Sequence, residues 1–248
     1  MSEKIYRRFF LALAGSSALF PSIVWPADDV PTLLDHFILG CNDLDHGIDF
    51  VEQHTGVRAA FGGVHPGRGT RNALLSLGER RYLEIMAPDP GQHVTPQIPR
   101  LLELKEPRIV GWAVHTTNLD ALAKKALAAG FAIEGPKNGT RSRPDGKVLH
   151  WRSFQLKNME ESPLPFFIEW SPETVHPSVD APSGCALLRF AVQTTNRVGL
   201  RESFGRLGVD ILMLGSPHRR TLASLLKGNV VTEVADKLPE NIQLLIHG

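Results

Sequence analysis

Three stretches of the chain share one pattern of apolar and polar positions. The clearest pair is WAVHTTN, ending at Asn118, and FAVQTTN, ending at Asn196, while a looser copy is DHFILGCND, ending at Asp43. Each stretch is alternating or continuously apolar, as in a strand, and each ends at an Asn or Asp, residues that cap helices. Apolar residues at helical spacing follow each cap. The pattern predicts three strand–helix units, with helices at residues 44–54, 119–129 and 197–207.

Short strand-like runs separated by Gly, Pro and Asn follow each predicted helix. They lie at residues 72–77 and 82–86, at 149–156 and 166–170, and at 221–226 and 230–234. Each unit therefore reads βαβββ, a repeat that decides the expected fold. We expect an α+β fold of repeated βαβββ modules, whose curled antiparallel or mixed sheets surround a cup-shaped pocket. Residues 135–147, rich in Pro, Gly, Asn and charge, are predicted to form a loop at its rim.

The first 27 residues differ from the rest and have the layout of a signal peptide. Basic residues at Lys4, Arg7 and Arg8 precede an apolar run that is too short and too broken to span a membrane comfortably. Residues 7–11, RRFFL, are similar to the twin-arginine export motif. We expect a periplasmic or otherwise exported protein without a membrane span once the leader is removed. An uncleaved anchoring start is the alternative, because Trp25 stands where cleavage sites usually have a small residue.

Composition and charge narrow the function without naming it. With 42% hydrophobic and 21% charged residues the chain is globular, and its net charge of +1 offers no field to attract nucleic acid. Cys41 and Cys185 are too few for a disulfide framework or a cysteine zinc site, although they leave one pairing open. The sequence has no nucleophile elbow, phosphate-cradling loop or dinucleotide fingerprint, which disfavours hydrolases, kinases and dehydrogenases.

Several motifs in order resemble the glyoxalase-like domain family of the vicinal-oxygen-chelate superfamily. They are HPGRGTRN at residues 65–72, YLEI at 82–85, RPDG at 143–146 and LPFFIEW at 164–170. The resemblance implies a domain of two modules at residues 33–178, with a third, divergent module at 184–248. The superfamily includes glutathione-dependent lyases, extradiol dioxygenases, epimerases and metal-free antibiotic-binding proteins, so the fold does not select a reaction.

The resemblance also implies a metal site. Metal-dependent relatives take four ligands from the first and last strands of paired modules, and aligning the modules on their helix caps gives His36, Glu84 and Glu169. The remaining position falls on Gly111, which has no ligating atom. One imidazole and two carboxylates suit a divalent ion such as Zn, Ni, Mn or Fe. A degenerate site without metal is the equal alternative, and His36 also fits a hydrogen-bonded core histidine.

The residues themselves favour a shared polar site. Glu84 and Glu169 lie in apolar runs, where an unpaired carboxylate is costly to bury, so we expect them to face each other and His36. His115 and His65 are the candidates for acid and base. For His115, a polar residue at a plain strand end is the alternative. The candidates for binding substrate, for which solvated loop charge is the alternative, are Arg68, Asn72, Arg143, His150 and Trp151.

Two functions follow from these expectations. The first is an enzyme of lyase, isomerase or dioxygenase type that binds a small oxygenated molecule, with His115 or His65 moving a proton. The second is a metal-free protein that sequesters a planar compound against Trp112, Trp151 and Trp170. The expected partner is a small molecule in both cases. An odd number of modules also makes a homodimer possible, since two modules are needed to close one cup.

Overall fold

The computed structural model describes residues 34–93, 95–96, 98–157, 164–192, 197–207 and 242–247. The predicted leader at 1–27 and the predicted strands at 221–226 and 230–234 lie outside the described residues, so export stays a prediction. The elements are β1 (Leu34–Gly40), α1 (Leu44–Thr55), β2 (Ala60–His65), β3 (Thr70–Ser76), β4 (Tyr82–Pro88), α2 (Ile98–Leu102), β5 (Arg108–His115), α3 (Leu119–Ala128), β6 (Ile133–Ser142), β7 (Val148–Leu156), β8 (Phe166–Trp170), β9 (Ala186–Val192), α4 (Arg197–Leu207) and β10 (Ile242–His247).

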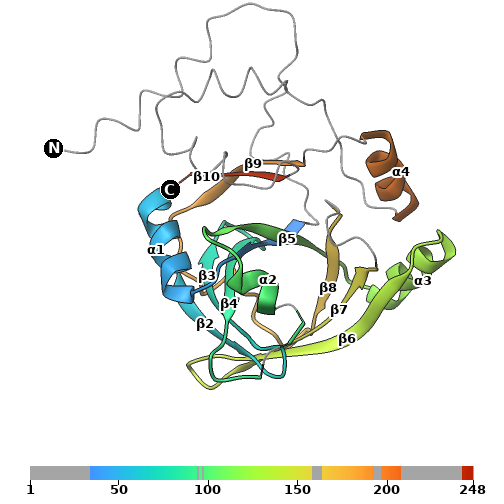
Figure 1. The fold of residues 1–248 in the computed structure, drawn as a ribbon. Helices are drawn as coiled ribbons and strands as arrows, with labels where there is room; N and C mark the ends of the chain where they lie inside the picture. Colours follow the sequence, from blue (N-terminus) through green and yellow to red (C-terminus); the bar gives the residue numbers. More distant parts are fainter. Residues whose placement is uncertain are drawn as a thin grey trace, which may run out of the picture.

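Two βαβββ modules close into one eight-stranded barrel (Figure 1). The first module supplies the strand order β1-β4-β3-β2 and the second supplies β5-β8-β7-β6. In each module the first strand is parallel to the last, and the remaining pairs are antiparallel. The modules meet along β1 and β5, and again where β2 meets β6. This mixed closed sheet confirms the fold class expected from the sequence.

The helices form where the caps predict them. Asp43 accepts a hydrogen bond from the His46 backbone N–H at the start of α1, and Asn118 caps α3 in the same way. Gly56 ends α1 in the left-handed conformation that glycine tolerates best. Both helices lie on the outside of the barrel, α1 beside β3 and β4 and α3 beside β6 and β7 (Figure 1).

The main hydrophobic core lies between the barrel wall and the elements that cover it. Phe37 of β1 and Trp112 of β5 both pack against Phe190 of β9, with ring centroids 5.1 and 4.8 Å apart. Trp112 therefore belongs to this outer core. The hypothesis of a binding protein placed Trp112 against the ligand inside the barrel, and the structure corrects that placement. Because large apolar side chains occupy the outer face, strand alternation gives the inner face to the polar residues of the same strands.

The segment at residues 135–147, predicted as a loop, is largely strand. β6 pairs with β7 from Ile133 to Ser142, with a register shift near its start. Pro, Gly and Asn disfavour strands in isolation, but pairing with a neighbouring strand overrides such preferences. Gly139 is needed there, because a Cβ at this position would lie 2.4 Å from the Trp151 ring.

The second junction between the modules depends on a close backbone approach. One register pair, Val64 with Ser142, joins β2 to β6. Gly63 beside it has a φ of 139°, and a Cβ there would lie 2.0 Å from the Ser142 carbonyl oxygen. Glycine at this position therefore lets the barrel close.

The third unit begins as predicted, with strand β9 and helix α4. β9 pairs with β10 in a separate antiparallel sheet, whereas the first and last strands of the barrel modules are parallel. This small sheet lies against the outside of the barrel near β5 (Figure 1). Cys41 and Cys185 are buried free thiols. No helix among the described residues has the length and apolarity needed to cross a membrane.

Candidate functional site

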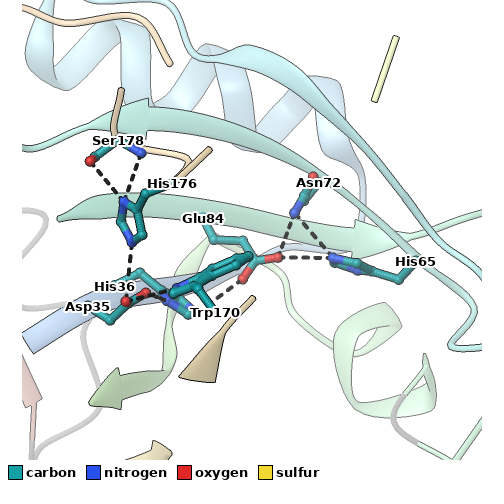
Figure 2. A network of polar contacts seen from close by, with 8 residues as sticks. All are labelled: Asp35, His36, His65, Asn72, Glu84, Trp170, His176 and Ser178. Carbon is teal, nitrogen blue, oxygen red and sulfur yellow. Dashed lines mark hydrogen bonds and ion pairs between the residues drawn. The ribbon is translucent and has the colours of Figure 1, made fainter. Parts of the chain in front are cut away.

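A buried carboxylate at the start of β1 holds one half of a polar network inside the barrel (Figure 2). The pairing of β1 with β5 is irregular between Leu34 and His36, so neighbouring Asp35 and His36 both take part in the network. The Asp35 carboxylate accepts hydrogen bonds from His36 Nδ1 at 2.6 Å, Trp170 Nε1 at 3.1 Å and His176 Nε2 at 3.2 Å. Asp35 thereby orients the His36 ring.

Glu84 of β4 is the centre of the other half. Asn72 Nδ2 donates to Glu84 Oε1 at 2.7 Å and lies 3.3 Å from His65 Nε2. His36 Nε2 is 3.6 Å from Glu84 Oε2, and His65 Nε2 is 3.5 Å from Glu84 Oε1. Figure 2 shows the carboxylate between the two imidazoles. The structure therefore brings together four residues singled out in the sequence: His36, His65, Asn72 and Glu84.

Both carboxylates are held in the ionised form. Burial alone would raise the pKa of Glu84, but His65, His36, the Asn72 hydrogen bond and Arg141 together lower it below its usual value. Burial likewise opposes ionisation of Asp35, yet its hydrogen bonds from His176 and His36 lower its pKa far below the usual range. At neutral pH the network therefore contains a carboxylate in each half.

His65 is a neutral imidazole at neutral pH. It is 7% exposed, and its Nδ1 lies 2.9 Å from Thr70 Oγ1. Burial lowers the pKa of His65 to about 4, although the charge of Glu84 opposes this shift. A neutral ring leaves one ring nitrogen free to accept a proton or a hydrogen bond.

The depressed pKa of His65 makes the protein less stable in mild acid. An unfolded histidine has a pKa of about 6.5, so between pH 6.5 and 4 the unfolded chain binds a proton that the folded chain does not. This contribution to stability is complete above pH 6.5 and is lost as the pH falls toward 4. We expect the free energy of unfolding, measured in urea, to fall by about 2 kcal/mol between pH 7.5 and pH 5.

His65→Gln should lose most of this difference, because glutamine does not titrate. His46→Gln, which changes an exposed histidine of α1, should keep it. Asp35 does not confuse the comparison, since its contribution is lost only below about pH 4. The same loss of stability in His65→Gln as in the unaltered protein would contradict the assignment.

Aromatic side chains from the second module face this network. The Phe166 ring lies 5.4 Å from His36, and Trp170 and Trp151 lie 5.5 Å from each other. The Arg68 guanidinium lies over Trp151 at 5.8 Å. The predicted residues Arg68 and Trp151 therefore join the site, in which aromatic side chains of the second module face the carboxylates and imidazoles of the first.

Glu169 does not join the site, and this corrects the expected ligand set. Phe166 and Trp170 of β8 contact His36 and Asp35, so Glu169 between them points to the outer face. Its Oε1 lies 3.4 Å from the Leu119 backbone N–H at the start of α3, and its Oε2 lies 3.6 Å from Arg152. The residues next to Glu169 are apolar because β8 is covered on both faces. They do not indicate that Glu169 shares a cavity with Glu84.

Three other predicted residues lie on or beside strands of the second module. His150 is exposed on β7, and its backbone N–H binds Thr174. Arg143 forms ion pairs with Asp145 and Asp180 at the end of the barrel. His115 is half-buried at the end of β5, opposite Ile168 in register. Of these three, only His115 shares the strand face of Ala113, which pairs with His36.

Across the described ranges, no group of three or more His, Cys, Asp or Glu side chains is placed to hold a metal ion. His36, His65 and Glu84 come nearest, but Glu169 lies outside and Gly111 supplies no ligand. The divalent ion expected from the sequence stays a prediction.

Three ionisable residues of the site were missed from the sequence. Asp35 precedes His36 directly, and an Asp-His pair opening a strand was the available signal. His176 lies in the connection between β8 and β9, where nothing in the local pattern indicates a partner for Asp35. Arg141 is 3% exposed and was assigned to a loop.

Comparison with known proteins shows which family profile and which solved structures the chain resembles. The profile of the family described as "Glyoxalase-like domain" matches residues 34–208. A hypothetical protein from Staphylococcus aureus has a similar structure, with a TM-score of 0.57, 16% identity, and 75% of this chain and 79% of that chain covered. This likeness concerns the fold alone.

Methylmalonyl-CoA epimerases match more weakly. The enzyme from Streptomyces coelicolor, in complex with 2-nitronate-propionyl-CoA, gives a TM-score of 0.44 at 20% identity, covering 59% of this chain and 99% of the enzyme. The enzyme from Mycobacterium tuberculosis gives 0.43 at 22% identity, covering 58% and 92%.

Proposed function

The chain belongs to the glyoxalase-like domain family, and from this premise we propose that it binds a small oxygenated molecule inside its barrel and transfers a proton on it. The observation that supports the proposal is the ionised, buried Glu84 between two imidazoles. Perturbed ionisable groups gathered at one place are typical of acid–base catalysis. The proposal specifies the type of reaction, that of a lyase or an isomerase, and leaves the substrate unnamed.

Glu84 is the proposed base. Its carboxylate removes a proton from a carbon next to a carbonyl group; the C–H bond breaks and its electron pair remains on the substrate as an enolate. The proton then returns to the same or a neighbouring carbon, so that no oxidant or reductant is needed. Asn72 holds the carboxylate in place through its hydrogen bond to Oε1.

His36 is the proposed partner acid. Its Nε2 lies 3.6 Å from Glu84 Oε2, while its Nδ1 donates to Asp35. A carboxylate on Nδ1 fixes the orientation of the ring and stabilises a positive charge on it. His36 is thereby suited to donate a proton to the enolate oxygen and to take it back.

A binding protein without catalysis is the second candidate. The aromatic side of the site, with Trp151 and Trp170 in contact and Arg68 over Trp151, suits a planar compound. Such a protein would bind its ligand without exchanging any of its protons. The two candidates therefore differ in one measurable reaction.

Proton exchange measured in D2O separates them. Pyruvate, 2-oxobutyrate, acetoacetate and hydroxyacetone each carry exchangeable C–H bonds next to a carbonyl group. We expect the protein to accelerate the loss of the corresponding ¹H NMR signal for at least one of them, compared with buffer. A compound that binds, by line broadening, without accelerated exchange would support the binding protein. Absence of accelerated exchange across all four would contradict the enzyme.

A further inference from the structure

Arg141 of β6 lies on the inner side of the barrel. Gly139, two residues earlier on the same face, contacts the Trp151 ring, whereas Thr140 and Ser142 are exposed. Arg141 is close enough to Tyr82 and Glu84 for their charges to influence its pKa, and close enough to His65 for its own charge to influence the pKa of that histidine. At 3% exposure, the arginine is buried beside the proposed base.

The guanidinium lacks the partners that a buried charge normally has. Its Nε is buried without a hydrogen-bond partner, and no ion pair joins Arg141 to a carboxylate in the described part of the chain. The nearby carboxylates are already engaged: Glu84 by Asn72 and two histidines, and Asp180 by Arg143. Arg141 is therefore a buried cation with unused donors.

The burial of a guanidinium whose donors have no acceptor requires an explanation. Burying an unpaired charge is costly, and a buried polar group without a partner is uncommon. Glu84 compensates the charge in part, but it does so without taking up the hydrogen-bond donors. Arginine presents its donors as a planar fork that fits the two oxygens of a carboxylate.

We propose that Arg141 binds an oxyanion of the substrate, a carboxylate group, and holds the neighbouring carbon next to Glu84. This inference rests on the proposed function and specifies its substrate class as small carboxylates with a carbonyl group. A phosphate group offers related oxygens, so the test includes it as a separate ligand.

Isothermal titration of the full chain tests the assignment. The ligands are pyruvate, 2-oxobutyrate, acetoacetate, the neutral pyruvamide and inorganic phosphate. We expect at least one carboxylate to bind, and pyruvamide to bind about tenfold or more weakly than pyruvate, because charge-assisted hydrogen bonds are lost. Phosphate binding more tightly than every carboxylate would overturn the proposal. So would the absence of carboxylate binding at ligand concentrations up to about 10 mM, where even weak specific ligands bind.

Variants place the effect on this residue. Arg141→Gln should weaken carboxylate binding by about tenfold or more, and Arg141→Lys by less, since lysine keeps the charge but not the fork. The matched control is Arg71→Gln, because Arg71 also has a buried Nε without a partner but lies on β3 next to inward-facing Asn72, on the opposite face. It should leave carboxylate affinity unchanged. Unchanged affinity in folded Arg141→Gln would overturn the assignment.

Two outcomes keep this inference separate from the proposed function. If Arg141→Gln does not fold, the ratio of pyruvate to pyruvamide affinity in the unaltered protein and the Arg141→Lys variant still decide the assignment. Exchange of hydroxyacetone protons as fast as those of the carboxylates would leave the enzyme in place and remove the role of Arg141. Carboxylate binding without any exchange would do the reverse.

Discussion

Replacing Glu84 with glutamine should lower the rate of proton exchange by roughly 100- to 10,000-fold, the range typical of a general base. Glutamine has nearly the same shape, and its carbonyl oxygen can still accept the hydrogen bond from Asn72. It has no basic oxygen to take the proton. Exchange is followed by ¹H NMR in D2O with whichever probe the unaltered protein turns over.

The control for this experiment is Glu103→Gln, which changes an exposed carboxylate just after α2. It should exchange the probe at the rate of the unaltered protein. Retention of exchange within about threefold in Glu84→Gln would exclude Glu84 as the base, since a lost general base costs far more. A melting curve for each variant separates loss of the base from loss of the fold.

Replacing Asp35 with asparagine should lower the free energy of unfolding by about 3–5 kcal/mol, the cost of breaking a buried charged network. Three donors, on His36, Trp170 and His176, converge on the Asp35 carboxylate. An amide has only one acceptor oxygen, so at least one buried donor would face its NH2 group. Urea unfolding at pH 7.5 measures the difference.

Asp45→Asn is the matched control, since Asp45 is exposed in the first turn of α1. Its effect should stay within about 0.5 kcal/mol, as for most surface substitutions. If Asp35→Asn were as mild as this control, the network around Asp35 would not be a significant source of stability.

The repeats were enough to predict the fold. Strand, cap and helix recur in order, and the Asp43 and Asn118 caps are local signals that do not depend on distant parts of the chain. Two copies of a module with one apolar helix face and alternating strands leave few ways to bury both faces. The pattern thus predicted curled sheets of βαβββ modules around a cup, and the structure closes two of these modules into a barrel.

The site was harder to predict because it depends on register. Aligning the modules on their caps put Glu169 opposite Glu84, but a shift of one residue moves a side chain to the other face of a strand. Arg141 was missed because Pro and Gly made its strand read as a loop. Asp35 joins the network through an irregularity of pairing that only the β1–β5 contact reveals.

The unequal contributions of the two modules have a consequence for how such a protein changes. The side chains in contact with Glu84 come from the first module, namely His36, His65 and Asn72, whereas the second supplies the facing Phe166, Trp151 and Trp170 and also Arg141. The proposed proton transfer therefore depends on groups of the first module, whereas the aromatic contacts and the proposed oxyanion contact of Arg141 depend on the second. Substitutions in the second module should therefore change which ligand fits while the carboxylate and imidazoles of the first module stay in place.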